Sequence, residues 1–112
     1  MATKQFAINA TTGSAVQVAP NDADRRACYI RNYSNSTVNP GQGTMWVAFG
    51  VVATAGTNGE LEVVPGAEYS FGGDLRPTTQ TLPGSFRLPN CPLESISVIT
   101  TGGTAVGCVV TQ

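Results

Sequence analysis

Hydrophobic and polar residues alternate along short stretches of this chain, and nothing shows a helical period over 11 residues. Alternation with period two is typical of β-strands, whose successive side chains point to opposite faces of a sheet. In Arg26–Tyr33, Cys28 and Ile30 would share one face and Tyr29 and Arg31 the other. We predict eight or nine short strands, at Lys4–Asn9, Ala15–Ala19, Arg26–Tyr33, Thr44–Gly50, Glu60–Val64, Glu68–Phe71, Ser85–Leu88, Leu93–Thr101 and Thr104–Thr111.

Short sequences that contain glycine or proline lie between several of these strands and predict turns. Pro65-Gly66 fits the centre of a type II turn, and Asn58-Gly59 predicts a tight turn before Glu60. Gly102-Gly103 predicts a hairpin between the last two strands. Regular turns between short strands favour one all-β domain over residues 1–112, either an antiparallel β-sandwich or a jelly-roll-like barrel.

The apolar positions also predict which residues form the core. Thr44–Gly50 is apolar on both faces, which is typical of a central strand covered on both sides. The other long strands place their apolar residues on one face, and that face is expected to be buried. The residues predicted to be largely buried are Cys28, Ile30, Val47, Phe49, Ile96, Val98, Val106 and Cys108.

Two segments are not predicted to form strands. Ser34–Gly43 and Gly72–Gly84 are rich in glycine, proline and polar residues, and both exceed the usual hairpin loop. They are either tolerated surface excursions or contact loops, because long ordered loops often carry function. Residues 1–9 contain the predicted strand Lys4–Asn9, which either joins the sheet of its own chain or serves as an N-terminal arm that adds a strand to the sheet edge of a neighbouring molecule.

Composition excludes several classes of function. Six Lys and Arg residues balance seven Asp and Glu residues, so the basic footprint of a nucleic-acid-binding protein is absent. Histidine, the commonest general base and metal ligand, does not occur. No apolar run is long enough for a membrane span, and the N-terminus lacks the pattern of a signal peptide. We therefore expect no catalytic residues, no cofactor, no metal, and neither nucleic acid nor membrane as a partner.

The cysteines and the charged residues suggest little chemistry. Cys28, Cys91 and Cys108 are odd in number and widely spaced, so free thiols are expected. Arg25-Arg26 next to two aspartates is most simply a local charge cluster before a strand. Glu60 and Glu62 share a strand face, and such a pair could flank a glycosidic bond, although paired carboxylates on a solvated face are common.

Aromatic residues and the long loops supply the candidate interface. Tyr29, Tyr33 and Trp46 could pack in the core, stack against a flat ligand or lie at a subunit interface, where aromatic residues are enriched. Asn39 and Arg76 belong to the two long loops and are further candidates for contact with a partner.

A pattern of motifs in this chain resembles a known family. The segments are RRACYIRNYS, TMWVAFG and ATAGTNGELEVVPGAEYSF, followed by the closing stretch CPLESISVITTGGTAVGCVVTQ. They resemble small β-rich virion proteins of tailed bacteriophages, in which Arg-Arg precedes an apolar strand, a second strand ends in Phe-Gly, and Pro-Gly precedes an aromatic residue. The resemblance runs from Arg25 to Gln112, and the two long loops, Ser34–Gly43 and Gly72–Gly84, depart from the family pattern.

The resemblance implies a non-enzymatic virion structural protein. The leading hypothesis is a capsid decoration (cement) protein that stabilises the shell by bridging neighbouring capsomers. The alternative is a tail, fibre or baseplate component that binds a host receptor or glycan. The implied partners are the major capsid protein or other virion proteins. We also expect a homo-oligomer, most simply a trimer that matches a threefold position of the shell. The chain would be made in the bacterial cytoplasm and reside on the capsid surface.

Overall fold

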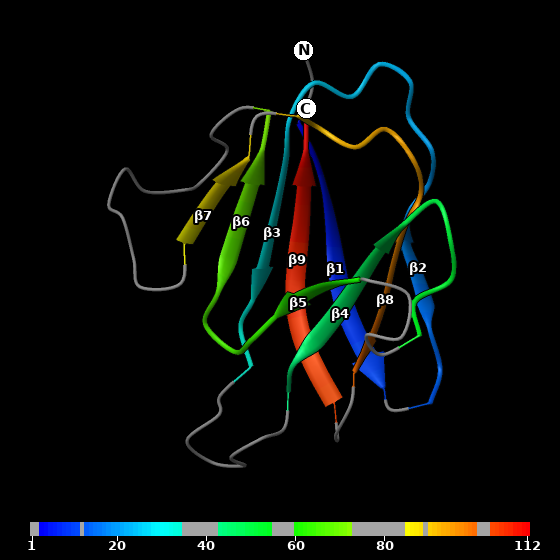
Figure 1. Cartoon of the computed structure of the whole chain (residues 1–112), viewed down its shortest axis with the longest axis vertical. Helices are drawn as coiled ribbons and strands as arrows, with labels where there is room; N and C mark the ends of the chain where they lie inside the picture. The colour runs from blue at the N-terminus through cyan, green and yellow to red at the C-terminus, as the bar shows by residue number, and fades with distance from the viewer. Residues whose placement is uncertain are drawn as a thin grey trace.

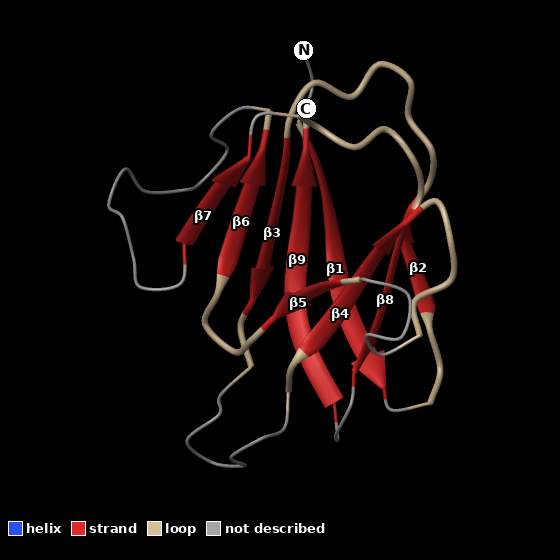
Figure 2. Ribbon diagram, in the orientation of Figure 1, coloured by secondary structure: helices blue, strands red, loops and turns tan. Residues whose placement is uncertain are grey.

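The computed structural model describes residues 3–11, 13–34, 43–54, 60–72, 85–88, 90–100 and 104–112. Within these residues the chain forms strands and loops but no helix (Figure 2). The predicted all-β fold is therefore confirmed. The nine strands of this part of the chain are β1 (Lys4–Thr11), β2 (Val16–Ala19), β3 (Cys28–Asn32), β4 (Met45–Phe49), β5 (Leu61–Val63), β6 (Glu68–Phe71), β7 (Ser85–Leu88), β8 (Ile96–Thr100) and β9 (Thr104–Thr111).

The strands form two layers. A five-stranded sheet has the order β1-β9-β3-β6-β7, and a four-stranded sheet has the order β2-β8-β4-β5. In Figure 1, β4 and β5 of the smaller sheet cross in front of the larger sheet, and β8 and β2 lie to the right of β1. The neighbouring strands are antiparallel except β6 and β7, which run parallel. The predicted antiparallel sandwich is therefore correct apart from this one edge pair.

The order in which the strands pair is that of a jelly roll. Without β7, the first strand pairs with the last (β1 with β9), the second with the second last (β2 with β8), the third with the sixth (β3 with β6), and the two central strands with each other (β4 with β5). A folded ribbon of antiparallel strand pairs that wraps into two sheets is the jelly-roll arrangement. Consecutive strands therefore usually lie in opposite sheets.

This wrapping contradicts the predicted C-terminal hairpin. β8 lies in the four-stranded sheet between β2 and β4, whereas β9 lies in the five-stranded sheet between β1 and β3. The pattern of apolar residues located both strands correctly, but alternation alone does not specify which sheet a strand joins. Gly102-Gly103 itself lies outside the described residues, as does the predicted turn at Asn58-Gly59.

The core fills the space between the two sheets. Six of the eight residues predicted to be buried are buried, namely Cys28, Ile30, Val47, Ile96, Val98 and Cys108. Phe49 is half-buried at the edge of the core, where its ring meets that of Phe71 edge-on at a centroid distance of 5.6 Å. The prediction was wrong for Val106, whose side chain is 43% exposed.

The error at Val106 has a structural cause in β9. Ala105 and Val109 of this strand point into the core, so Val106 and Cys108 belong to the opposite, outer face of the sheet. Gly107, which lies between them on the core side, has no side chain to reveal that alternation in the sequence. Cys108 is nevertheless buried, because the hydroxyl of Tyr33 lies 3.2 Å from its sulfur.

Two local predictions are confirmed. Gly66 has a φ of 85°, and the amide of Ala67 donates to the carbonyl of Val64 at 2.9 Å, as a type II turn at Pro65-Gly66 requires. β4 is an interior strand that lies between β8 and β5. Its inner face contributes Met45 and Val47 to the core, and its outer face carries a second, smaller apolar cluster.

The N-terminal segment is not a free arm. From Lys4 onward it forms β1, which pairs with β9 in continuous register from Lys4–Thr111 to Thr11–Thr104. Eight residue pairs hold this strand to its own molecule through the ladder with β9. Its alternating apolar residues Ile8 and Ala10 also enter the core. Residues 4–9 of the segment expected as an arm therefore belong to an edge strand of the chain's own sheet.

Cys28, Cys91 and Cys108 are free thiols, as predicted. Burial raises the pKa of the Cys28 thiol from its ordinary value of 9.0 to about 12, with a further contribution from Cys91. Across the described ranges, no helix has the length and apolar character needed to cross a membrane.

Candidate interaction surface

The outer face of the five-stranded sheet is arranged in three rows across the strands. The register places Gln5, Val110, Tyr29 and Ser70 in one row. A second row contains Ala7, Cys108, Arg31 and Glu68. A third contains Asn9 and Val106, and Tyr33 extends it because its amide donates to the carbonyl of Val106 at 2.8 Å. Residues in one row of a sheet have adjacent side chains, so the rows define which groups meet.

The half of this face on β3 and β6 is a buried polar network. The hydroxyl of Tyr29 donates to Oε2 of Glu68 at 2.6 Å, and both side chains are buried. Burial and the hydrogen bond to Glu68 raise the pKa of the Tyr29 hydroxyl. Tyr29 was a candidate interface residue, but only 1% of it is exposed. Within its own chain it is a structural residue that fixes β3 to β6, and its interface role stays a prediction.

The half of the face on β1 and β9 is exposed and nearly uncharged. We call it the Tyr33 face and define it by Gln5, Ala7, Asn9, Val106 and Tyr33, all of which are exposed. These residues present the aromatic ring of Tyr33, the aliphatic side chain of Val106, the side-chain amides of Gln5 and Asn9, and the methyl group of Ala7. A weakly charged face with an aromatic anchor is typical of protein interfaces, where Tyr is enriched and Asp, Glu and Lys are depleted.

Tyr33 is held in place although it is 49% exposed. The guanidinium carbon of Arg31 lies 4.8 Å from the centroid of its ring, within the range of a cation–π contact. Its hydroxyl lies 3.2 Å from the sulfur of Cys108, and this hydrogen bond, followed by burial, raises the pKa of the hydroxyl. The ring is therefore fixed by two contacts before any partner binds, which lowers the entropy cost of docking.

Trp46, another candidate, lies on the outer face of the other sheet. It is half-buried and packs against the small apolar cluster of Ala48, Ala53 and Ile99. It pairs in register with Glu62. These contacts favour a role for Trp46 in covering β4 rather than in stacking on a ligand. The two remaining candidates, Asn39 and Arg76, lie outside the described residues.

The predicted charge cluster at Arg25-Arg26 is a structural clamp. Arg25 is 5% exposed, and its guanidinium donates to the carbonyl oxygens of Pro92 and Glu94 at 2.8 and 3.0 Å, and to that of Pro20 at 2.9 Å. It therefore ties the segment before β8 to the end of β2. The expected local charge cluster is therefore wrong for Arg25, whose guanidinium binds carbonyl oxygens, whereas Arg26 is exposed.

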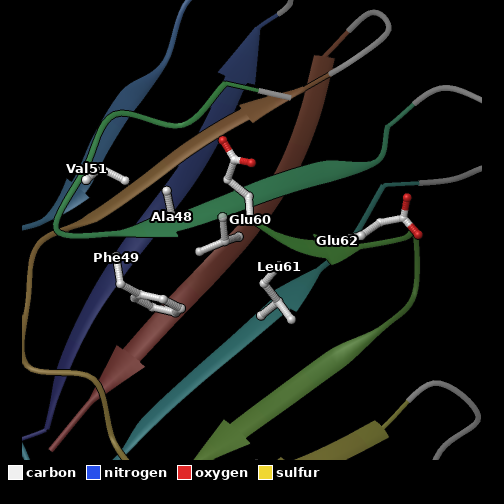
Figure 3. Close-up of a pocket in the computed structure, with 7 residues that line it drawn as sticks. Ala48, Phe49, Val51, Glu60, Leu61 and Glu62 are labelled. Atoms are coloured by element: carbon white, nitrogen blue, oxygen red, sulfur yellow. The ribbon is translucent and has the colours of Figure 1, made fainter. Parts of the chain in front are cut away.

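The two glutamates line a shallow hollow of about 420 Å³ beside β4 and β5. Figure 3 shows Phe49 and Leu61 on one side of this strand pair and the carboxylate of Glu60 on the other. The Glu60 carboxylate accepts hydrogen bonds from both the amide and the hydroxyl of Thr54. Its geometry is that of a fixed acceptor that holds the loop after β4.

Comparison of the chain with protein-family models, with curated proteins and with solved structures found no match. The candidate surface therefore rests on the residues themselves. Of its five members, the sequence suggested only Tyr33. Gln5, Ala7 and Asn9 were not among the candidates, although the strand predicted at Lys4–Asn9 already alternates them with Phe6 and Ile8.

Proposed function

We propose that this chain is a non-enzymatic structural protein of a tailed-bacteriophage virion that decorates the outside of the capsid shell. The observation that carries the proposal is the Tyr33 face: an exposed, nearly uncharged face of a small jelly roll, with an aromatic anchor already fixed by Arg31. The resemblance from Arg25 to Gln112 supports the class of protein. The Tyr33 face supports binding to a broad protein surface.

The way the ionisable groups are used agrees with this proposal. Arg25 binds three carbonyl oxygens, Glu60 binds Thr54, and Glu68 accepts from Tyr29. Each of these charges stabilises the fold of the chain itself. A decoration protein needs such a rigid fold, because it stabilises a shell by adding buried area between capsomers without chemical change.

Rebinding to shells tests the proposal. Virus particles produced without this chain are mixed with purified protein and sedimented, and the bound fraction is measured against concentration. We expect saturable binding to the head, and about tenfold or greater weakening in the double variant Tyr33→Ser with Val106→Ser, because interface anchors often contribute 2 kcal/mol or more. The matched control is Val51→Ser with Val52→Ser, which removes two exposed apolar residues from the loop after β4 and leaves the Tyr33 face intact.

Each outcome of that assay is informative. Binding to tails alone would reject decoration and favour the tail, fibre or baseplate alternative. Head binding that is lost in the control pair and unchanged in the Tyr33 pair would keep decoration but reject the Tyr33 face as the contact. The identity of the capsid protein as the partner is a further prediction of the same proposal.

A further inference from the structure

We propose that the free edge of β1 pairs with β1 of a second copy of this chain, in antiparallel orientation, to form one continuous sheet across a twofold axis. The proposal concerns the purified chain and stands independently of shell binding. It rests on a comparison of the sheet edges, since only some of them carry the features that prevent strand addition.

β1 is a long and regular edge strand. Its eight residues pair with β9 without a register shift, and it contains no proline. Its one charged residue, Lys4, lies at the end of the strand on the side of Phe6 and Ile8, where its side chain is 63% exposed. No hydrogen bond from any described residue reaches its other edge. An exposed, long and flat edge is a template for another strand, and natural proteins usually protect such edges.

Both edges of the smaller sheet are protected. β5 has three residues, and two of its carbonyl oxygens are already occupied: the hydroxyl of Tyr69 donates to Glu62 at 3.1 Å, and Nδ2 of Asn32 donates to Val63 at 2.8 Å. β2 has four residues, its pairing with β8 shifts register between Gln17 and Ala19, and proline follows directly. Shortness, bulges, proline and covering contacts are the usual devices that protect an edge.

The two edges of the larger sheet also differ. β7 is half as long as β1, with four residues that pair in parallel with β6. The eight residues of β1 span about 27 Å, and antiparallel pairing with a second copy would form about six to eight hydrogen bonds. The unprotected edge is therefore also the one with the most backbone hydrogen-bonding capacity to offer.

A second copy fits this edge because the strand is self-complementary. A twofold axis perpendicular to the sheet keeps the outer faces of both copies on the same side. An outward-pointing residue of one β1 must therefore face an outward-pointing residue of the other, and an inward-pointing residue an inward-pointing one. With the axis at Ala7, Gln5 faces Asn9 of the other copy. With the axis at Ile8, Ala7 faces Asn9 of the other copy. Lys4, the one charged residue of β1, meets no like charge in either register, and its ammonium already lies 3.6 Å from the carboxylate of Asp22.

The same axis has a consequence for binding. Because it keeps the outer faces on the same side, the Tyr33 faces of both copies point in one direction and form one extended surface. A surface of twice the size suits a partner with its own twofold symmetry. The pairing predicts a dimer in solution in place of the trimer expected from the threefold positions of a shell.

Sedimentation equilibrium of the purified chain tests the edge pairing. We expect the wild type to have twice the mass of one chain, and the double variant Ala7→Lys with Asn9→Lys to have the mass of one chain. These two lysines would place like charges opposite each other in both registers. The control is Thr104→Lys with Val106→Lys, which adds the same charges at the same spacing to exposed positions of β9, one strand away from the edge.

The control should remain a dimer, and circular dichroism should show the same strand content in all three proteins. A wild-type monomer at millimolar concentration, a trimer, or a dimer that persists in the β1 variant would overturn the proposal. A dimer lost equally in the control would overturn it as well, because the contact would then belong to the face and not to the edge.

Discussion

The Cα atom of Gly107 faces the carbonyl oxygen of Arg31 on the adjacent strand so closely that any side chain at this position would collide with the backbone. A glycine within a strand often marks such a close approach of another backbone. The contact brings β9 against β3 at the point where Arg31 and Tyr33 support the Tyr33 face. Gly107 is therefore a structural requirement of the candidate surface as well as the reason why β9 was misread.

Gly107→Ala is expected to destabilise the protein strongly. The added methyl group meets backbone, which has no rotamer by which to move aside, so we expect a loss of about 3 kcal/mol in the free energy of unfolding. Urea unfolding measures it. The comparison is Gly66→Ala, where the new methyl group meets no neighbour and only the positive φ costs about 1 kcal/mol. Equal losses at the two positions would contradict the close approach.

The buried guanidinium of Arg25 should contribute more to the free energy of unfolding than the exposed guanidinium of Arg26. Arg25→Ala leaves the carbonyl oxygens of Pro20, Pro92 and Glu94 without this donor, and we expect a loss of about 3 kcal/mol. Arg26→Ala removes the same charge from an exposed position and should change the stability by about 0.5 kcal/mol or less. Thermal or urea unfolding of both variants checks the prediction, and similar losses would refute the role of Arg25 as a clamp.

Asn32 joins the two sheets through its side-chain amide. Its Nδ2 donates to the carbonyl oxygens of Gly43 at 2.6 Å and Val63 at 2.8 Å, and its Oδ1 accepts from the amide of Ser34. Asn32→Asp exchanges a double donor for a buried carboxylate, so we expect a loss of about 3 kcal/mol at pH 7. Asn9→Asp makes the same change on the exposed face of β1 and should cost little. An Asn32→Asp variant as stable as the Asn9→Asp variant would contradict this role.

The raised pKa of Cys28 predicts a loss of stability at alkaline pH. The folded state holds the proton more tightly than the unfolded state, so this contribution is complete below pH 9.0 and is lost as the pH rises towards about 12. For this group the slope of unfolding free energy against pH approaches about 1.4 kcal/mol per unit. Cys28→Ala should reduce the slope above pH 9.0, whereas Ile30→Val, a core truncation without an ionisable group, should not. Parallel curves for Cys28→Ala and the wild type would refute the prediction.

The sequence predicted where the strands lie far better than it predicted which strands pair with each other. Alternation located the strands, and the Pro-Gly pair located the turn at Pro65-Gly66, because both signals are local. The assignment of β8 and β9 to opposite sheets depends on how the whole ribbon wraps, and no residue between them encodes that choice. A local signal for a turn was therefore mistaken for a hairpin.

The candidate surface was predicted less well, because exposure on the outer face depends on neighbouring strands. Tyr29 and Tyr33 are both aromatic and lie four residues apart, yet only Tyr29 meets a glutamate on β6 and becomes buried. Arg25 and Arg26 are adjacent in the chain, yet only Arg25 turns toward carbonyl oxygens of the segment before β8. Such distinctions arise from contacts between residues far apart in sequence.

A cryo-EM map of the intact virus particle at side-chain resolution tests the proposal that the chain decorates a capsid shell through the Tyr33 face. The predicted result is density for this jelly roll on the outside of the head, with the β1 and β9 side of its larger sheet against the capsid protein and the ring of Tyr33 buried in the contact. Density for the chain only at the tail, or on the head with the Tyr33 face turned toward solvent, would contradict the account.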